Sequence, residues 1–414
     1  MEWRAGVSSN FWILLMSSRV TGRSLSPTKK EIAGLLLRLS VEVSAEARGN
    51  GNHDAGSGRP VTWEDLRMNY NQQHKFYCGV DLHARSMYVH IVDHKGKSIF
   101  DRDLAADPDE FLDAIKPFRK NIVVGCECMF AWYWLADLCE DQRLPFALGH
   151  ALAMKHIHGG KAKSDKIDAG KLANMLRGGL FPLAYAYPRA KRQTRDLLRR
   201  RSFFVRQRAS LIAHIVNTNS QFNLPPLPKK LRYASNRSDA IAQRFADPST
   251  RLMVASDLAM IDHYDQQIHE MESYLVKSAK VDDAVTFGLL RTIPGIGPIL
   301  GLILLYEIDS IGRFPEAGNF LSYSRLVRCE HSSAGKVKGS GGKKIGNAHL
   351  KWAFSEAACL MIRAVPAVKS WLQRQEKKRG KRKALSVLEA KIGRAVYHLW
   401  SKQVPFDLKR FLKG

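Results

Sequence analysis

Residues 75–82 read KFYCGVDL, and this stretch decides how the N-terminal half of the chain folds. It is short, apolar and aromatic, which predicts a buried strand. Asp81 nevertheless stands inside it, between Val80 and Leu82. A charge within an apolar strand is costly unless it is paired or binds a metal ion. The stretch therefore predicts both a sheet and a functional acid.

The residues that follow predict the rest of this sheet. Alternating apolar and polar side chains at 86–92 are typical of a hairpin partner, and DHKG at 93–96 has the chemistry of a turn. Strands are expected at residues 75–82, 86–92, 97–104, 121–128 and 144–148, and helices at 107–118 and 131–141. Three antiparallel strands followed by alternating helix and strand indicate a mixed α/β sheet.

Three more acids are candidates for the same functional site as Asp81. Glu127 stands near the end of the apolar stretch NIVVGCEC, and Asp165 and Asp168 are three residues apart in KSDKID. Ser164 is expected to cap a helix, which places both aspartates on one face of its first turns. Such carboxylates can converge at the end of a sheet and bind Mg²⁺, singly or as a pair of ions. The alternative for each acid is a cap or turn role, and for Asp165 the alternative is that it simply caps its helix.

The chain is strongly basic, with 65 Lys and Arg against 39 Asp and Glu and a formal net charge of +26. This excess predicts a large polyanion as partner. A charged lipid surface is the competing interpretation, but no apolar run approaches the roughly 20 residues needed to cross a bilayer. The six cysteines are scattered without a CxxC pair, which argues against zinc and disulfides and favours a reducing cytoplasm.

Basic residues gather at two places where nucleic acid is expected to bind. Lys161 and Lys163 stand beside the paired aspartates, where they would neutralise a DNA backbone. Residues 189–208 hold nine basic residues and one acid, interleaved with aromatic side chains. This excess favours backbone contact over the alternative of a solvated helix face. The arginines singled out here are Arg195, Arg199 and Arg200.

Composition and periodicity divide the chain into five segments. Leu197, Phe204 and Leu211 recur every seven residues, which predicts a coiled coil or a long helical hairpin. We expect a disordered or misannotated extension at 1–67 with translation beginning at Met68. The segments after it are a mixed α/β domain at 75–186, a basic helical coiled-coil region at 187–284, a mainly helical domain at 285–370 and a basic helical tail at 371–414.

Two glycine-rich stretches near the C-terminus are candidates for phosphate contact. IPGIGP at 293–298 looks like a helix-hairpin-helix turn, in which Gly295 and Gly297 let backbone N–H groups approach a phosphate. The alternative is a tight helix–helix turn without a ligand. GSGGKKIGN at 339–347 contains Lys343 and Lys344 and is expected to wrap a nucleic-acid backbone, the alternative being a disordered loop.

These motifs together resemble a known family. GVDLH at 79–83, Glu127 and KSDKIDA at 163–169 resemble the RuvC-like, RNase H-fold domain of DEDD transposases of the insertion-sequence 110 family, including its 1111 branch. Residues 290–307 and 322–358 resemble the C-terminal transposase domain of the same family. The resemblance implies an α/β domain of this fold, a helical coiled-coil middle and a mainly helical end.

The resemblance also implies a mechanism and partners. A serine of the C-terminal domain attacks a DNA phosphate and becomes linked to it. In HSSAGK, Ser333 fits best, Ser332 is the near alternative, and Lys336 follows as a backbone contact. Also implied are Mg²⁺ or Mn²⁺ on Asp81, Glu127, Asp165 and Asp168, DNA of the element ends and target, a structured guide RNA, a homodimer or homotetramer, and a bacterial, nucleoid-associated location. Without the family resemblance, the serine stretch is interpreted as a flexible loop.

The leading hypothesis is therefore a transposase that acts as a serine- and metal-dependent, RNA-guided DNA recombinase. Two alternatives stay open at this point. One is a metal-dependent junction-resolving nuclease that uses water and forms no covalent intermediate. The other is a nucleic-acid-binding protein without catalysis.

Overall fold

The computed structural model describes residues 69–157, 164–327, 329–333, 336–341 and 345–413. The expected extension at 1–67 and the candidate contacts Lys161, Lys163, Lys343 and Lys344 lie outside these residues. No helix in the described part of the chain has the length and apolar character needed to span a membrane.

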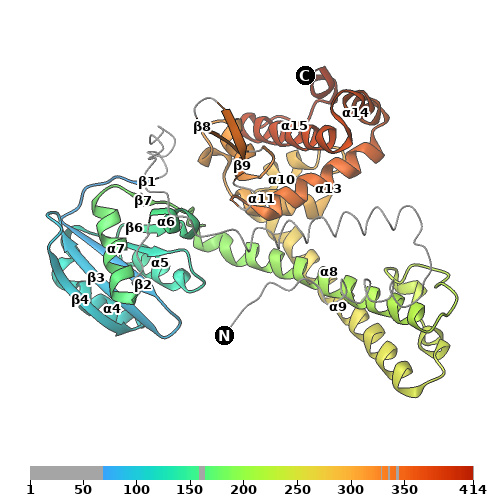
Figure 1. The fold of residues 1–414 in the computed structure, drawn as a ribbon, viewed down its shortest axis with the longest axis horizontal. Coiled ribbons are helices and arrows are strands. Elements are labelled where there is room, and N and C mark those ends of the chain that lie inside the picture. Colours follow the sequence, from blue (N-terminus) through green and yellow to red (C-terminus); the bar gives the residue numbers. More distant parts are fainter. Residues whose placement is uncertain (1–68, 158–163, 328, 334–335, 342–344, 414) are drawn as a thin grey trace. The chain divides into compact units, whose positions relative to one another are not determined.

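A five-stranded mixed sheet forms the N-terminal domain (Figure 1). Its strands are β2 (Phe76–Leu82), β3 (Ser86–Asp93), β4 (Ser98–Ala105), β5 (Ile122–Glu127) and β6 (Phe146–Gly149), in the order β4-β3-β2-β5-β6. The first three pair antiparallel, whereas β5 runs parallel to β2 and to β6. The predicted mixed α/β sheet is confirmed, and each strand boundary lies within about two residues of its expected position.

Helices cover both faces of this sheet because its central strands are apolar on both sides. The helices are α4 (Pro108–Ile115), followed by the 3₁₀ turn η1 (Lys116–Asn121), then α5 (Trp132–Asp141), α6 (Ala151–Ile157) and α7 (Asp165–Arg177). Phe111 of α4 and Leu135 of α5 pack with Val80 on one face. Leu172 of α7 packs with Tyr77 on the other. Two short strands, β1 (Asn69–Tyr70) and β7 (Phe181–Pro182), pair beside the sheet.

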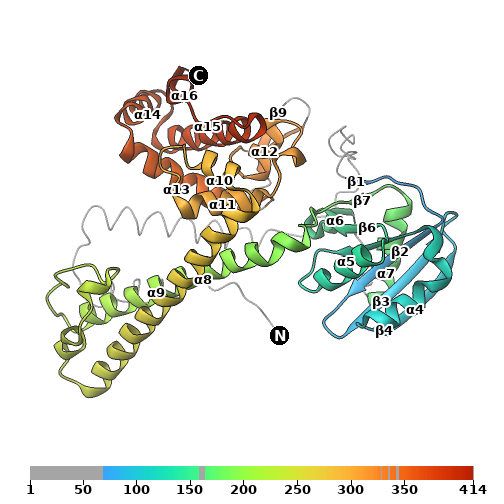
Figure 2. The ribbon, with the colours of Figure 1, turned by 180° about the vertical axis from the view of Figure 1, so that it is seen from behind.

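Two long helices follow, α8 (Arg189–Gln221) and α9 (Pro248–Asp282), and they pack along each other (Figure 2). Phe204 of α8 contacts Tyr264 of α9 with ring centroids 5.2 Å apart. Arg208 also forms an ion pair with Asp265 across the helices. The proline-rich connection contains only the short 3₁₀ turns η2 (Ala234–Asn236) and η3 (Asp239–Arg244). The predicted helical pairing and the loop are both present.

The C-terminal region is mostly helical and shares one apolar core. Its helices are α10 (Ala284–Leu290), α11 (Pro298–Ile308), the 3₁₀ turn η4 (Ile311–Arg313), α12 (Ala317–Tyr323), α13 (Ala348–Ala364), α14 (Pro366–Arg379), α15 (Lys381–Lys402) and α16 (Leu408–Lys413). Leu388, Ile392 and Val396 of α15 are fully buried in this core. The final helices therefore pack with the preceding ones through their apolar faces, although their sequence is basic.

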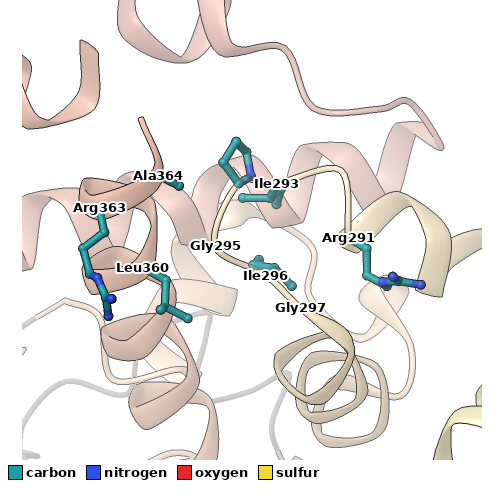
Figure 3. A pocket seen from close by; sticks show the side chains of 9 residues that line it. Arg291, Ile293, Gly295, Ile296, Gly297, Leu360, Arg363 and Ala364 are labelled. Carbon is teal, nitrogen blue, oxygen red and sulfur yellow. The ribbon is translucent and has the colours of Figure 1, made fainter. Parts of the chain in front are cut away.

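The turn between α10 and α11 contains Gly295 and Gly297, with Arg291 and Arg363 on either side of a shallow pocket (Figure 3). Gly295 has a φ of +92°, and a Cβ there would lie 2.7 Å from the backbone nitrogen of Met361. A glycine is thus required at 295 both by backbone conformation and by the close approach of α13.

A β-hairpin interrupts the helical region at the stretch that carries the two candidate serines. Strand β8 (Cys329–Ser333) pairs antiparallel with β9 (Lys336–Gly341), and Ser333 is the register partner of Lys336. The flexible-loop alternative for the serine stretch is wrong at residues 329–333, and the first residues of the glycine-rich stretch, 339–341, belong to β9. Strand pairing uses backbone N–H and C=O groups, which glycine and serine supply as well as other residues do.

Candidate functional site

Asp81 and Glu127 stand at the same edge of the sheet. Strands β2 and β5 are parallel neighbours, and their register pairs Val80 with Cys126. The next residue on each strand is Asp81 on β2 and Glu127 on β5, so the two acids lie at one level near the carboxyl ends of the strands. This edge is where open α/β sheets place their ligand sites.

Helix α7 brings the other two acids to this edge. Ser164 caps the helix, because its Oγ accepts a hydrogen bond from the Ile167 backbone N–H at 3.3 Å. The predicted cap is confirmed, and Asp165 and Asp168 lie in the first turn. The helix packs directly on Gly79 of β2, where a Cβ would come within 2.2 Å of a backbone oxygen of α7. Glycine at 79 therefore lets the aspartates of α7 reach Asp81.

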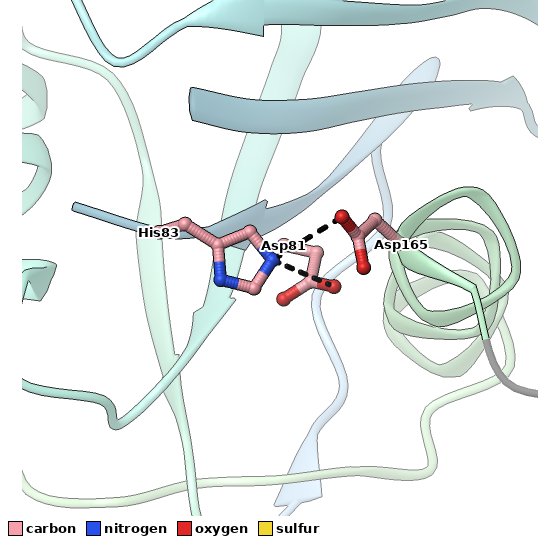
Figure 4. Close-up of side chains that lie close together, drawn as sticks. All are labelled: Asp81, His83 and Asp165. Carbon is pink, nitrogen blue, oxygen red and sulfur yellow. Dashed lines mark ion pairs between the residues drawn. The ribbon is translucent and has the colours of Figure 1, made fainter. Parts of the chain in front are cut away.

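Asp81, His83 and Asp165 bring three potential metal-ligand atoms close together at this edge (Figure 4). The His83 Nε2 atom lies 3.4 Å from Asp165 Oδ2 and 3.8 Å from Asp81 Oδ2. One ligand atom from each of the three lies within 4.8 Å of the others. Carboxylate oxygens and an imidazole nitrogen are common ligands of divalent metal ions, so the donor set fits such an ion.

The acids interact electrostatically with one another. Burial raises the pKa of Asp81, the nearby His83 opposes this, and the negative charges of Asp165, Asp168 and Glu127 raise the pKa further. The negative charges of three neighbouring carboxylates thus disfavour ionisation of Asp81. A divalent cation would relieve this repulsion.

Two of the predicted acids lie outside this group of three. Asp168 accepts a hydrogen bond from Lys171 Nζ at 3.1 Å, and Glu127 is half-buried at the end of β5. His83, in contrast, belongs to the group although the sequence did not single it out. The available signal was its spacing, because a residue two positions beyond Asp81 falls on the same face where the extended chain continues past the strand.

The arginines singled out on α8 have different environments. The Arg195 guanidinium is buried and lies 3.7 Å from the ring centroid of Tyr187. Arg199 makes two hydrogen bonds to Glu307, at 2.7 and 2.8 Å. Arg200 is exposed and lies over the Phe203 ring at 5.0 Å. Arg195 and Arg199 therefore make contacts within the protein, and Arg200 alone of the three is exposed.

Glu307 connects α8 to the residues that follow the serine hairpin. Its carboxylate is 1% exposed and accepts hydrogen bonds from Arg199 and, at 2.8 Å, from Asn347 Nδ2. Asn347 in turn caps α13 through the backbone N–H groups of His349 and Leu350. Burial raises the pKa of Glu307, but hydrogen bonds and charge from Arg199, with the Asn347 hydrogen bond, hold it below its usual range. The acid is thus ionised and fully paired.

Replacing Glu307 with glutamine is expected to lower the free energy of unfolding by about 3 kcal/mol, because Arg199 loses its partner in a largely buried site. Since the folded-state pKa of Glu307 is depressed, its contribution is present above its ordinary pKa of 4.5 and is lost as the pH falls through the depressed value. Urea unfolding followed by tryptophan fluorescence at neutral and acidic pH measures both effects. The exposed Glu316→Gln control should change stability by less than about 0.5 kcal/mol, and equal losses in both variants would contradict the assignment.

Two family models match the chain. One, described as the transposase IS116/IS110/IS902 family, matches residues 288–373, and the other, a DEDD transposase domain of IS110 elements, matches residues 78–221. Together they cover more than half of the 414 residues. The transposase of insertion sequence element IS1111A from Coxiella burnetii is 21% identical over 333 residues, which are 78% of this chain and 89% of that protein.

The matched regions contain the two sites that the sequence singled out. The DEDD model spans the sheet with its acids, and the second model spans the 293–298 turn and the serine hairpin. A DEDD nuclease domain implies a divalent metal ion, and transposition implies DNA binding. The chain therefore belongs to the IS110/IS1111 family of DEDD transposases and is a transposase enzyme.

Proposed function

We propose that this transposase cleaves, exchanges and rejoins DNA strands to excise and integrate its insertion sequence, using Asp81, Glu127, Asp165 and Asp168 together with Ser333. The convergence of carboxylates from β2, β5 and α7 at one edge of the sheet is the observation that carries this proposal. The strongly basic composition supports a polyanionic substrate.

The carboxylates are assigned to holding the ion. Asp81 and Asp165 each offer an oxygen atom of the three-residue group, and Glu127 and Asp168 add negative charge that acts on Asp81. When bound, Mg²⁺ or Mn²⁺ stabilises charge on the oxygens of a reacting phosphate. In our proposal, the protein residues position this charge and keep it beside the DNA backbone.

Ser333 is assigned as the nucleophile because it fits the family pattern and ends β8 at the tip of the hairpin, with Ser332 as its neighbour. Its Oγ forms a bond to the phosphorus while one bridging P–O bond of the DNA breaks. The hydroxyl proton leaves the serine, and the departing oxygen takes up a proton. The new phosphodiester retains the energy of the old one, so the reverse reaction rejoins strands without ATP.

Nucleic acid is proposed to follow the basic surfaces of the protein. Arg200 with its neighbouring aromatic ring suits a phosphate and base contact, and Lys336 begins the strand after the serine turn. Lys161, Lys163, Lys343 and Lys344 remain candidates on sequence grounds, whereas Arg195 and Arg199 are omitted because the protein uses them itself. A structured guide RNA, assembly as a dimer or tetramer through α8 and α9, and a bacterial, nucleoid-associated location complete the proposal.

The turn before α11 is proposed to contact a DNA phosphate through Gly297. A Cβ at Gly297, unlike one at Gly295, would meet no heavy atom within 4 Å. The φ of −81° at Gly297 also suits any residue. The first helical residue is Pro298, and no side chain caps the helix. The backbone N–H groups at this end of α11, flanked by Arg291 and Arg363, are therefore suited to an anion.

Gly297→Ala and Gly295→Ala form a matched pair that separates binding from folding. Gly297→Ala is expected to leave stability within about 0.5 kcal/mol but to weaken DNA binding roughly tenfold, because the methyl group blocks one charged hydrogen bond. Gly295→Ala is expected to cost about 2 kcal/mol or more, because of its positive φ and the contact with α13. Fluorescence anisotropy with labelled DNA and urea unfolding measure the two effects. Unchanged DNA affinity in Gly297→Ala would argue against the phosphate contact.

A covalent protein–DNA adduct tests the proposed function as a whole. Full-length protein, Mg²⁺, the candidate guide RNA and DNA of the element end are combined, and the products are separated under denaturing conditions. We expect DNA joined to the protein. A junction-resolving nuclease would cut without an adduct, and a binding protein would do neither.

A further inference from the structure

His83 stands directly after β2, and its position is fixed by the turn into β3. Its backbone N–H donates a hydrogen bond to the Ser86 carbonyl oxygen at 2.9 Å. It lies two residues beyond Asp81, and its ring is turned toward Asp81 and toward Asp165 of α7 (Figure 4). The imidazole is therefore held at the same edge as the acids by the local fold of β2 and β3.

The distances around His83 are those of ion pairs, longer than direct hydrogen bonds, and they also leave room for a shared ion. Charge-assisted hydrogen bonds are usually about 2.7–2.9 Å long. The Nε2 atom instead lies 3.4 Å from Asp165 and 3.8 Å from Asp81. Atoms that each lie about 2.1 Å from one ion stand roughly 3 Å apart when adjacent and roughly 4.2 Å apart when opposite. Both observed separations fall within this range.

The exposure of His83 leaves its ring accessible to an ion. Its side chain is 46% exposed, compared with 18% for Asp81 and 57% for Asp165. A cation can thus reach all three ligand atoms from solvent without displacing a packed side chain. The roles proposed for the four acids and for the serine hairpin do not require an imidazole at this place.

We propose that His83 is a third metal ligand, which supplies a nitrogen atom beside Asp81 and Asp165 and makes the site prefer Mn²⁺ over Mg²⁺. This inference rests on the proposed metal site at the acids. Mg²⁺ favours oxygen ligands and retained water, whereas imidazole is a better ligand for transition metals. A site with one nitrogen and two carboxylates accordingly binds both ions but discriminates in favour of Mn²⁺.

Pulsed electron paramagnetic resonance of Mn²⁺ tests this ligand directly and needs no DNA or turnover. Full-length protein receives less than one equivalent of Mn²⁺, and the spectrum is searched for coupling to a nitrogen nucleus. We expect coupling in the wild type, its loss in His83→Ala and His83→Gln, and its retention in His94→Ala. His94 is the matched control because it is an exposed histidine of the same sheet, in the β3–β4 turn.

Metal affinities add a second readout. His83→Ala is expected to weaken Mn²⁺ binding at least about tenfold while Mg²⁺ binding changes much less, so that the two affinities converge. Bound Mn²⁺ without nitrogen coupling, or equal loss for both ions, would overturn the role of His83 and leave the acidic site standing. Failure of the wild type to bind either ion would overturn both this inference and the proposed metal site.

Discussion

Ser333→Ala is expected to abolish the covalent protein–DNA adduct and to lower strand transfer by at least about 10⁴-fold. Alanine has no oxygen that can form a bond to phosphorus, so the proposed exchange cannot begin. The proposed metal site, more than 160 positions earlier in the sequence, keeps all its proposed ligands in this variant. DNA binding should therefore remain near the wild-type level while joining is lost. A denaturing gel detects the adduct, and mass spectrometry of the protein–DNA peptide locates it.

Two other serines of the hairpin make this experiment decisive. Ser340→Ala in β9 is the matched control and should transfer strands at the wild-type rate, because Ser340 pairs opposite Glu330, away from the hairpin tip. Ser332→Ala addresses the neighbouring candidate and should retain the adduct. Loss of the adduct in Ser332→Ala alone would move the nucleophile by one residue. Cleavage that persists in the Ser332/Ser333 double variant would favour a nuclease that uses water.

The sheet and its acids could be predicted from sequence because their signals are local. The strands β2 and β5 are short apolar runs, and each carries a charged residue near its end. Packing of an apolar core does not explain these charges. The cap at Ser164 follows from the residue type and its place before a helix. The folded chain was needed for two features: the register of β2 with β5, which places Asp81 and Glu127 at the same level, and the packing of α7 on Gly79.

The remaining features depend on partners that are distant in sequence. A run of arginines on α8 predicts a basic surface, but it does not show that Glu307, 108 residues beyond Arg199, neutralises one of them. The burial of Arg195 against Tyr187 is likewise a tertiary contact. For the serine stretch, glycine and serine favour loops by propensity, and backbone pairing between β8 and β9 overrides that preference. His83 was missed because its neighbour Asp165 lies on another element.

Asp81→Asn is expected to lower both DNA cleavage and strand transfer by at least about 10³-fold. Asparagine keeps the size of the side chain but removes the charge that, in the proposed site, holds a divalent ion between β2 and α7. The folded protein should tolerate the change. A carboxyl whose folded-state pKa is raised contributes stability below its ordinary pKa of 3.8 and loses it as the pH rises through the raised value. At neutral pH the neutral amide therefore removes an unfavourable charge.

The Asp81→Asn change is thus expected to lower activity without lowering the stability of the metal-free protein. This combination distinguishes a metal ligand from a structural acid. Without metal, the Asp81→Asn protein should unfold at the wild-type temperature or slightly above it. With Mg²⁺ or Mn²⁺ at about 100 times its dissociation constant, the wild type should gain about 2.7 kcal/mol, and the variant should gain little. Asp103→Asn, on the exposed edge strand β4, is the matched control and should retain both activity and the metal-induced gain. A purely structural Asp81 would instead lose stability in metal-free buffer, and an inactive variant that still gains stability from the ion would place the metal elsewhere.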